Sequence, residues 1–117
     1  MAGPRILSLP EFIAALRTVD RERLWNVLTE EYFAGELVPG SRWVPLDRIG
    51  REVAAHSLDR TATIIVYCSG VGCPNSKDAG AKLATLGFTD VLVFEGGLEA
   101  WKADGRGVEI LRTASAA

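Results

Sequence analysis

Four short runs of apolar residues divide the chain into segments. The two clearest lie in its second half, at residues 63–67 (Thr-Ile-Ile-Val-Tyr) and 91–94 (Val-Leu-Val-Phe). Both are continuously apolar or β-branched and do not alternate with polar positions, which is typical of strands covered on both faces in a parallel sheet. Shorter runs at 24–28 and 42–46 predict two further strands. We expect the strand over 63–67 to lie at the centre of the sheet.

Apolar residues at helical spacing lie between these runs. Residues 8–11 read Ser-Leu-Pro-Glu, a capping box with proline in the first turn, and predict a helix of about ten residues. Asp47 is expected to cap a second helix, which gives way to a polar connection over 56–60. A third helix is predicted over 74–86, with Gly87 at its C-terminal end.

A last helix is predicted over 98–103, after a tight turn at Gly96-Gly97. Strands that alternate with helices predict an α/β fold with a central, mainly parallel sheet of about five strands and helices on both faces. We expect one domain over residues 1–117, with an ordered core over about 6–111 and a frayed tail after it.

The composition is that of one globular domain with one core. The chain has 117 residues, of which 48% are hydrophobic and 24% charged. Its 13 basic and 15 acidic residues are scattered, so no basic stripe is available for phosphates and we expect no nucleic-acid partner. No segment approaches the roughly 20 apolar residues of a membrane-spanning helix, and the start lacks a secretory apolar run. We therefore expect no membrane partner and a cytoplasmic location.

The cysteine count points away from a secreted protein. Cys68 and Cys73 are too few for the disulfide framework of a small secreted domain, and in a reducing cell close thiols more often bind metal or do redox work. Zinc requires three or four ligands, and His56 is the only histidine. We expect no metal site, and an exposed His56 without a catalytic role.

Cys68 directly follows the predicted central strand. In an open parallel sheet, ligands bind beyond the carboxyl ends of the strands, where loops lead into helix N-termini. Gly70 and Gly72 allow the loop to curl with its N–H groups pointing inward, and the helix dipole adds positive potential. We therefore expect the loop to bind an anion and to lower the pKa of Cys68, which makes its thiolate a nucleophile.

The candidate anion-binding loop comprises Ser69, Gly70, Val71, Gly72, Cys73, Asn75 and Ser76. The alternative is that Cys68 is a small buried apolar residue, since free cysteines are often part of the core. Lys77 is the nearest cation in sequence, but solvation at the surface is the commoner role of a lysine. We favour the reactive thiol because packing alone does not require a glycine-containing loop before a helix.

Three blocks along the chain together form a recognisable pattern. The blocks are Asn26-Val27-Leu28 with Glu31, Phe33 and Val38-Pro39-Gly40-Ser41; Ile65-Val66-Tyr67-Cys68 with Ser76, Leu83, Gly87 and Phe88; and Glu95-Gly96-Gly97-Leu98 with Trp101. In order and intervals they resemble the rhodanese-like domain, the fold of a sulfurtransferase family. The resemblance implies a rhodanese-like fold and a catalytic Cys68 that accepts sulfur as a persulfide.

The loop departs from the family's pattern. Seven residues separate Cys68 from Ser76, two more than usual. The family's Arg or Lys falls on Asn75 or Cys73, neither of which is charged. Backbone N–H groups would then hold an anion without a guanidinium, which argues against phosphatase-like or arsenate-reducing chemistry. The family's bracing Asp–Arg ion pair is also absent, and we expect apolar packing by Leu28 in its place.

Cys73 is an addition to the family's pattern. With two glycines between, its sulfur would reach Cys68 if the Cα atoms come within about 7 Å. It would then resolve a persulfide on Cys68 as sulfide and a disulfide, or form a redox switch with it. The alternative is that Cys73 only occupies the position before Pro74 at the helix start.

Our leading hypothesis is a sulfurtransferase. The Cys68 thiolate takes the outer sulfur of a small donor such as thiosulfate, holds it as a persulfide, and passes it to a thiol, a protein thiol or cyanide, with no cofactor. Loop N–H groups would stabilise the anionic sulfur. A persulfide-carrier or redox-sensing module would use Cys68 and Cys73 without rapid turnover. A catalytically silent interaction domain would leave both thiols unreactive.

Overall fold

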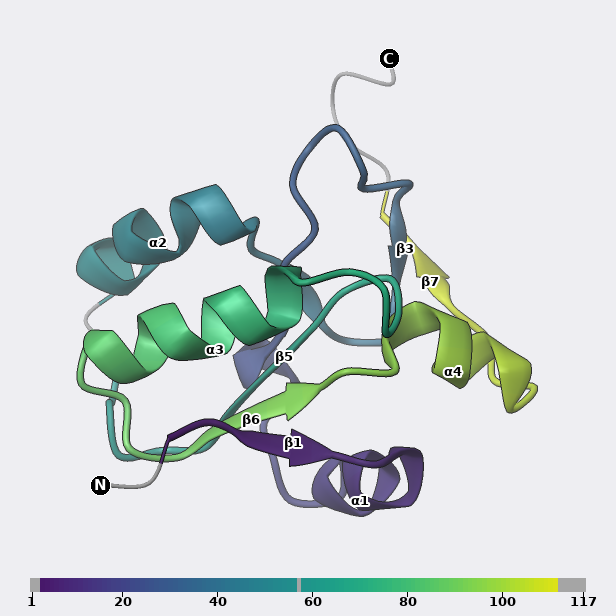
Figure 1. Cartoon of the computed structure of the whole chain (residues 1–117), viewed down its shortest axis with the longest axis horizontal. Helices are drawn as coiled ribbons and strands as arrows, with labels where there is room; N and C mark the ends of the chain where they lie inside the picture. The colour runs from purple at the N-terminus through teal and green to yellow at the C-terminus, as the bar shows by residue number, and fades with distance from the viewer. Residues whose placement is uncertain (1–2, 57, 112–117) are drawn as a thin grey trace.

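The computed structural model describes residues 3–56 and 58–111, which form a parallel sheet flanked by helices (Figure 1). The strands of this sheet are β1 (Arg5–Leu7), β2 (Leu24–Asn26), β4 (Arg42–Trp43), β5 (Ile64–Tyr67) and β6 (Val91–Phe94). Their order is β1-β6-β5-β2-β4, and every neighbouring pair is parallel. β3 (Glu36–Leu37) and β7 (Glu109–Ile110) form a separate antiparallel pair. The predicted α/β fold with a mainly parallel sheet is confirmed.

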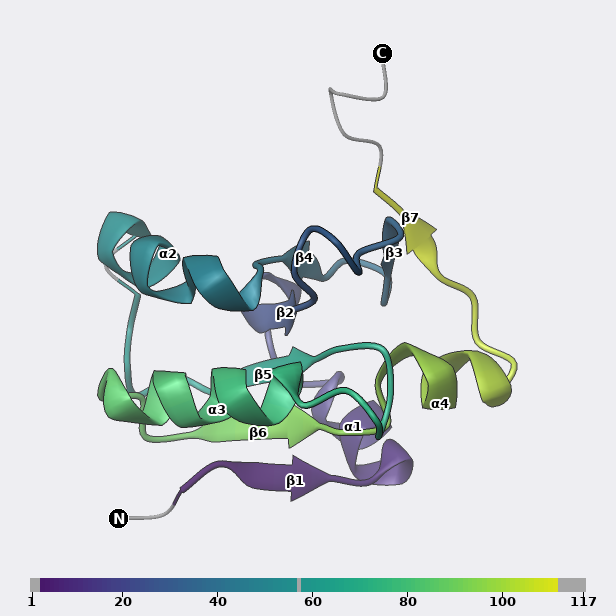
Figure 2. The ribbon, with the colours of Figure 1, turned by 45° about the horizontal axis from the view of Figure 1, so that its top comes forward.

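Helices cover both faces of the sheet (Figures 1 and 2). They are α1 (Leu9–Ala15), α2 (Ile49–His56), α3 (Asn75–Thr85) and α4 (Gly97–Ala103), with 3-10 turns η1 (Arg21–Arg23) and η2 (Leu46–Arg48). Val93 and Phe94 follow each other on β6 and so point to opposite faces. A Cβ on Gly80 of α3 would lie 2.8 Å from Val93, whereas Phe12 of α1 stacks on Phe94 with ring centroids 4.0 Å apart. α3 therefore covers one face and α1 the other, with α4 beside α1 through a contact of Phe12 with Trp101.

β5 lies at the centre of the sheet, as predicted, and all four of its residues are buried. The hydroxyl of Tyr67, its last residue, accepts a hydrogen bond from the Val38 N–H at 2.9 Å and shares another with Ser41 Oγ at 2.7 Å. Burial raises the pKa of Tyr67 to about 12, so the phenol stays neutral near pH 7. The loop that ends at Ser41 thus fixes the residue directly before Cys68.

The first helix begins as predicted but is shorter. Glu11 N–H donates to Ser8 Oγ at 3.3 Å, and Ser8 N–H donates to Glu11 Oε1 at 2.9 Å, which completes the predicted capping box. α1 then ends at Ala15 after seven residues.

The expectation that Asp47 caps the second helix is wrong. Asp47 lies inside η2, which starts after Pro45 without a side-chain cap and continues directly into α2. α2 also includes His56, which was expected in a polar connection; its imidazole is exposed and lies 3.3 Å from Glu52. α2 therefore begins as a continuation of a 3-10 turn, without a capping side chain.

Two predicted strands end early because side chains and proline interrupt them. Asn26 Oδ1 accepts a hydrogen bond from Leu28 N–H at 2.9 Å, and the Asn26 amide donates to Glu36 O at 3.1 Å. These bonds turn the chain after three strand residues. Pro45 has no N–H for a ladder, and β4 ends before it.

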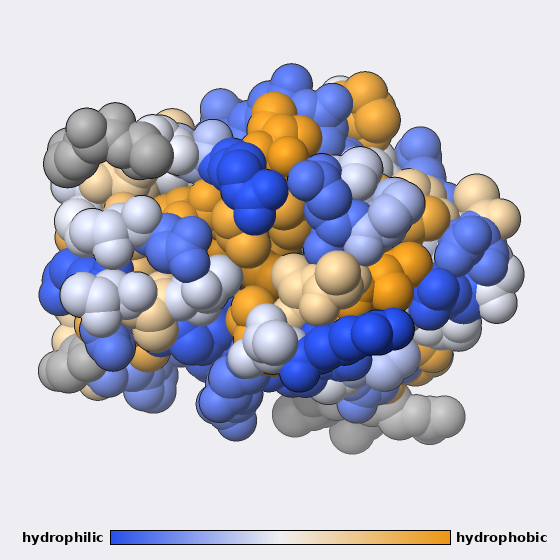
Figure 3. Space-filling view, turned by 90° about the horizontal axis from the view of Figure 1, so that it is seen from below, coloured by the Kyte–Doolittle hydropathy of each residue, from blue (hydrophilic) through white to orange (hydrophobic). Residues whose placement is uncertain are grey.

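β1 is an edge strand that the apolar pattern did not predict. Leu7 is its buried residue, Ile6 is 49% exposed, and Arg5 lies 3.5 Å from Glu11. Figure 3 views the molecule from this side and shows apolar surface broken up by polar side chains. Charged side chains on an edge discourage pairing with another strand.

In residues 3–56 and 58–111, no helix has the length and apolar character needed to cross a membrane. The tail predicted for residues 112–117 lies outside the described residues.

Candidate active site

Cys68 is held at the carboxyl end of β5 by the start of α4. Leu98 N–H donates to Cys68 O at 3.0 Å, and Glu99 N–H donates to Ser69 O at 2.8 Å. Gly97 has a φ of +57°, and a Cβ on it would lie 2.2 Å from Cys68 O. Only glycine fits there, so the Gly-Gly pair at the start of α4 packs directly against the backbone of Cys68.

The Cys68 thiol faces the interior. Cys68 is 0% exposed, and its sulfur donates to the carbonyl oxygen of Cys73 at 3.4 Å. Burial raises the pKa of the Cys68 thiol, and the neighbouring Cys73 thiol adds to the rise. The nearby hydroxyl and N–H of Ser76 act in the opposite direction and lower it. The expectation that the loop lowers the pKa of Cys68 is therefore wrong, because desolvation outweighs the polar groups that reach this sulfur.

The polar groups of the loop converge instead on the half-buried Cys73. Partial burial acts to raise the pKa of Cys73, but hydrogen bonds from the Cys68 thiol, the Asn75 N–H and the Ser69 N–H and side chain together lower it. The loop is closed by a hydrogen bond from Cys73 N–H to Gly70 O at 3.0 Å. Of the two thiols, Cys73 is thus the one whose surroundings stabilise a thiolate.

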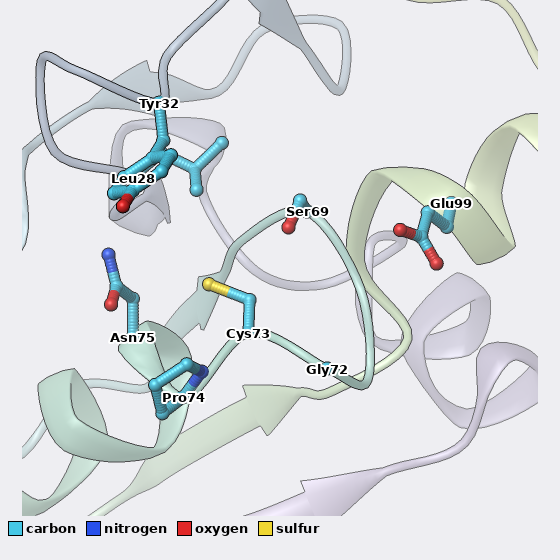
Figure 4. Close-up of a pocket in the computed structure, with 8 residues that line it drawn as sticks. All are labelled: Leu28, Tyr32, Ser69, Gly72, Cys73, Pro74, Asn75 and Glu99. Carbon is cyan, nitrogen blue, oxygen red and sulfur yellow. The ribbon is translucent and has the colours of Figure 1, made fainter.

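A cavity of about 640 Å³ opens in front of Cys73 (Figure 4). Its lining residues are Leu28, Tyr32, Ser69, Gly72, Cys73, Pro74, Asn75 and Glu99. Figure 4 shows the Cys73 sulfur pointing into the space toward Leu28 and Asn75. Cys68 is not among the lining residues, so a molecule in this cavity meets Cys73 first.

The lining carries a negative charge and no positive one. Glu99 is its charged residue, and the Glu99 carboxylate packs against Gly70, where a Cβ would lie 2.5 Å from it. Lys77, the nearest cation in sequence to Cys68, lies 2.9 Å from Glu95 in an ion pair and does not line the cavity. An anion in this cavity would therefore depend on N–H groups and meet repulsion from Glu99.

The residues of the candidate anion-binding loop do not all line the cavity. Ser69, Gly72, Cys73 and Asn75 line the cavity, whereas Val71 lies at the tip and is 67% exposed. Ser76 is buried beside Cys68, and its Oγ has no hydrogen-bond partner by distance within the part of the chain that the structure describes.

Sequence reasoning missed four lining residues, Leu28, Tyr32, Pro74 and Glu99, of which Leu28 was expected only to pack in the core. Pro74 directly follows Cys73, so its place could have been found from the loop itself. Tyr32 comes from the connection after β2 and Glu99 from α4. Nothing in the local sequence signals that these two side chains face the cysteine loop. In residues 3–56 and 58–111, no three His, Cys, Asp or Glu side chains gather in a way that could hold a metal ion.

The chain belongs to the rhodanese-like domain family, whose sequence model matches residues 10–104. This range includes the parallel sheet from β2 to β6, the cysteine loop and the Gly-Gly turn that packs on it. None of the curated proteins matches the chain in sequence.

Solved structures show the same fold at low identity. The BH2092 protein from Bacillus halodurans is 25% identical, with a TM-score of 0.72 over 92% of this chain and 76% of that one. The Alr3790 protein from Anabaena sp. is 23% identical, with a TM-score of 0.72 over 90% and 92%. A thiosulfate sulfurtransferase from Pseudomonas aeruginosa is 20% identical, with a TM-score of 0.73 over 94% of this chain and 21% of that one.

Proposed function

We propose that this domain is a sulfurtransferase that carries sulfur as a cysteine persulfide in the loop of Cys68 and Cys73. Membership of the rhodanese-like family supports the reaction class, and one protein of similar fold is named a thiosulfate sulfurtransferase. The observation that carries the proposal is a thiol that lines a cavity with a second thiol directly behind it. Cys73 lines it, and the Cys68 sulfur lies 3.4 Å from the Cys73 carbonyl oxygen.

The reaction stores sulfur covalently between two transfers. A loop thiolate attacks the outer sulfur of a donor such as thiosulfate, the S–S bond of the donor breaks, and sulfite leaves with its electron pair. The persulfide then gives its outer sulfur to a small thiol, a protein thiol or cyanide. Splitting one transfer into two lowers each barrier. The N–H groups of Ser69 and Asn75 stabilise the anionic sulfur, and the reaction needs no cofactor.

Release of sulfite tests this proposal because it reports acceptance of sulfur whatever becomes of the persulfide. The reduced parent protein is mixed with thiosulfate beside a variant with both Cys68→Ser and Cys73→Ser. The parent should release one sulfite per chain in a single turnover, and the double variant none. A parent that releases no sulfite and makes no thiocyanate with added cyanide would overturn the proposal.

The closeness of the two thiols favours a second function, that of a persulfide carrier or redox sensor. Such a module would form a reversible Cys68–Cys73 disulfide but would not turn over thiosulfate and cyanide. A catalytically silent interaction domain would leave both thiols unreactive toward iodoacetamide at neutral pH. Either thiol chemistry suits a reducing compartment such as the cytoplasm, where both cysteines stay available.

A further inference from the structure

The two cysteines differ in what can reach them. Cys68 is 0% exposed, does not line the cavity, and has its sulfur against the backbone of Cys73. The start of α4 holds the backbone beside it, where the N–H groups of Leu98 and Glu99 donate to the carbonyl oxygens of Cys68 and Ser69. A donor in the cavity therefore meets the Cys73 sulfur before that of Cys68.

Cys73 has the opposite setting. Its sulfur points into the cavity of about 640 Å³ (Figure 4). The N–H groups of Ser69 and Asn75 act to lower the pKa of this thiol. The Cys68 thiol donates to the carbonyl oxygen of Cys73 at 3.4 Å. Cys73 is therefore the thiol that faces the cavity, and the second thiol lies directly behind it, inside the protein.

We propose that Cys73, and not Cys68, takes the sulfur from the donor, and that Cys68 then releases it as hydrosulfide by forming a disulfide with Cys73. This inference rests on the proposed sulfurtransferase function and reverses the order of the two thiols that the family resemblance implies. It gives the domain a further activity, the thiol-dependent reduction of sulfane sulfur to sulfide.

The steps balance with the groups present and one external thiol. The Cys73 thiolate attacks the outer sulfur of thiosulfate, a new S–S bond forms on Cys73, and sulfite leaves with the electrons of the broken bond. Cys68 sulfur then attacks the inner sulfur, Cys73 Sγ, and the outer sulfur leaves as hydrosulfide with the proton of the Cys68 thiol. The two thiols are oxidised to a disulfide while the sulfane sulfur is reduced. A small thiol or dithiol reduces the disulfide and resets the site.

The burial of Cys68 suits it to this second role. A resolving thiol needs access only to the neighbouring persulfide, and the Cys68 sulfur already lies 3.4 Å from the carbonyl oxygen of Cys73. Ser76, with an unpartnered buried Oγ beside Cys68, provides a hydroxyl that can accept the thiol proton's hydrogen bond or stabilise the sulfur as it is deprotonated.

Two single variants separate the order of the thiols. Cys68→Ala and Cys73→Ala are each reduced, checked for folding by circular dichroism, treated with thiosulfate without added thiol, and analysed by intact mass and sulfide assay. We expect Cys68→Ala to keep one added sulfur on Cys73 and to release at least about tenfold less sulfide than the parent. Cys73→Ala should gain no sulfur and release no sulfite. The parent should end as a disulfide, with one sulfite and one sulfide released.

The opposite pattern, with sulfur added to Cys73→Ala and none to Cys68→Ala, would overturn the inference but leave the proposed function standing. A parent that accepts no sulfur overturns the proposed function itself, so the two failures are distinguishable. The parent protein gives an independent readout if a variant does not fold. Brief iodoacetamide treatment and peptide mapping should find Cys73 modified at least about tenfold faster than Cys68. Faster modification of Cys68 would contradict the inference.

Discussion

The two ends of the cysteine loop lie five residues apart in sequence and have opposite surroundings. The Cys68 end is buried, and burial raises the pKa of its thiol. The Cys73 end lines the cavity, and hydrogen bonds to its sulfur outweigh partial burial, so its pKa is lowered. Within one loop, desolvation and nearby polar groups therefore shift the pKa values of the two thiols in opposite directions.

A helix that starts after a strand therefore does not necessarily lower the pKa of the cysteine nearest to the strand end. The loop is long enough to place Cys73 beside Cys68, where the N–H groups of Ser69 and Asn75 lower the pKa of Cys73 instead. We call the Cys68 end of the loop the closed end and the Cys73 end the open end. Four predictions, from the largest expected effect to the smallest, test the contacts that stabilise the closed end and the groups that set the reactivity of the open end.

The largest effect should come from Gly97→Ala at the closed end. The new Cβ would lie 2.2 Å from Cys68 O at a φ of +57°, so α4 must move away from the loop. We expect a loss of more than about 3 kcal/mol in the free energy of unfolding, measured in urea. Gly105→Ala is the matched control, because Gly105 also has a positive φ but no neighbour within 4 Å; its cost should be about 1 kcal/mol. Equal costs would contradict a close contact between α4 and the cysteine loop.

Tyr67→Phe should lower the free energy of unfolding by removing hydrogen bonds of the residue directly before Cys68. It removes the hydroxyl that accepts from the buried Val38 N–H and bonds to Ser41 Oγ. Leaving these groups without a partner should cost about 2 kcal/mol in urea unfolding. Tyr32→Phe removes the same hydroxyl from a side chain that is 69% exposed, and should change stability by less than about 0.5 kcal/mol. A similar loss in both variants would show that the Tyr67 hydrogen bonds are not what stabilises this end.

Glu99→Gln should change the open end by removing the negative charge of the cavity lining. We expect sulfite release from thiosulfate to become roughly threefold faster at low ionic strength, with the gain shrinking as salt is added. Alkylation by the neutral iodoacetamide should change much less. Glu22→Gln alters the net charge equally from η1, outside the cavity lining, and should leave sulfite release unchanged. An effect of equal size in both variants would mean that net charge, and not Glu99 in the cavity, governs the rate.

The smallest effect should be a shift in the pH dependence of Cys73 alkylation. The neighbouring Cys68 thiol lowers the pKa of Cys73. Removing this thiol in Cys68→Ala should raise the pKa of Cys73, and the midpoint of the rate against pH should move upward by less than about one unit. Val71→Ala, at the exposed loop tip, should not move it. A midpoint that stays in place or falls in Cys68→Ala would show that the two thiols do not interact in this way.

Parts of this arrangement were predictable from local sequence. Ile64–Tyr67 and Val91–Phe94 are strands because each is an unbroken apolar run that must be covered on both faces. Ser8 and Glu11 cap α1 through bonds across three residues, which any short segment can satisfy by itself. The position of Cys68 at the end of the central strand follows from the same pattern.

Other elements depend on contacts that no local pattern encodes. β1 has one buried residue and is a strand because β6 offers it an edge. β3 and β7 are two residues each and pair across most of the chain. Asp47 has the right residue type for a cap, but η2 replaces the cap with a 3-10 turn.

The sequence by itself determined the family, the fold class and the loop that carries both cysteines, because those follow from apolar runs, glycines and their order. The tertiary structure decided which thiol is buried. Leu98 and Glu99, some thirty residues after Cys68, donate to the carbonyl oxygens of Cys68 and Ser69 and hold this end of the loop in the interior. Tyr32, Leu28 and Glu99 then complete the cavity in front of Cys73. The pKa of a thiol depends on desolvation and on the donors within a few ångströms, and both are set by distant segments brought together in the fold.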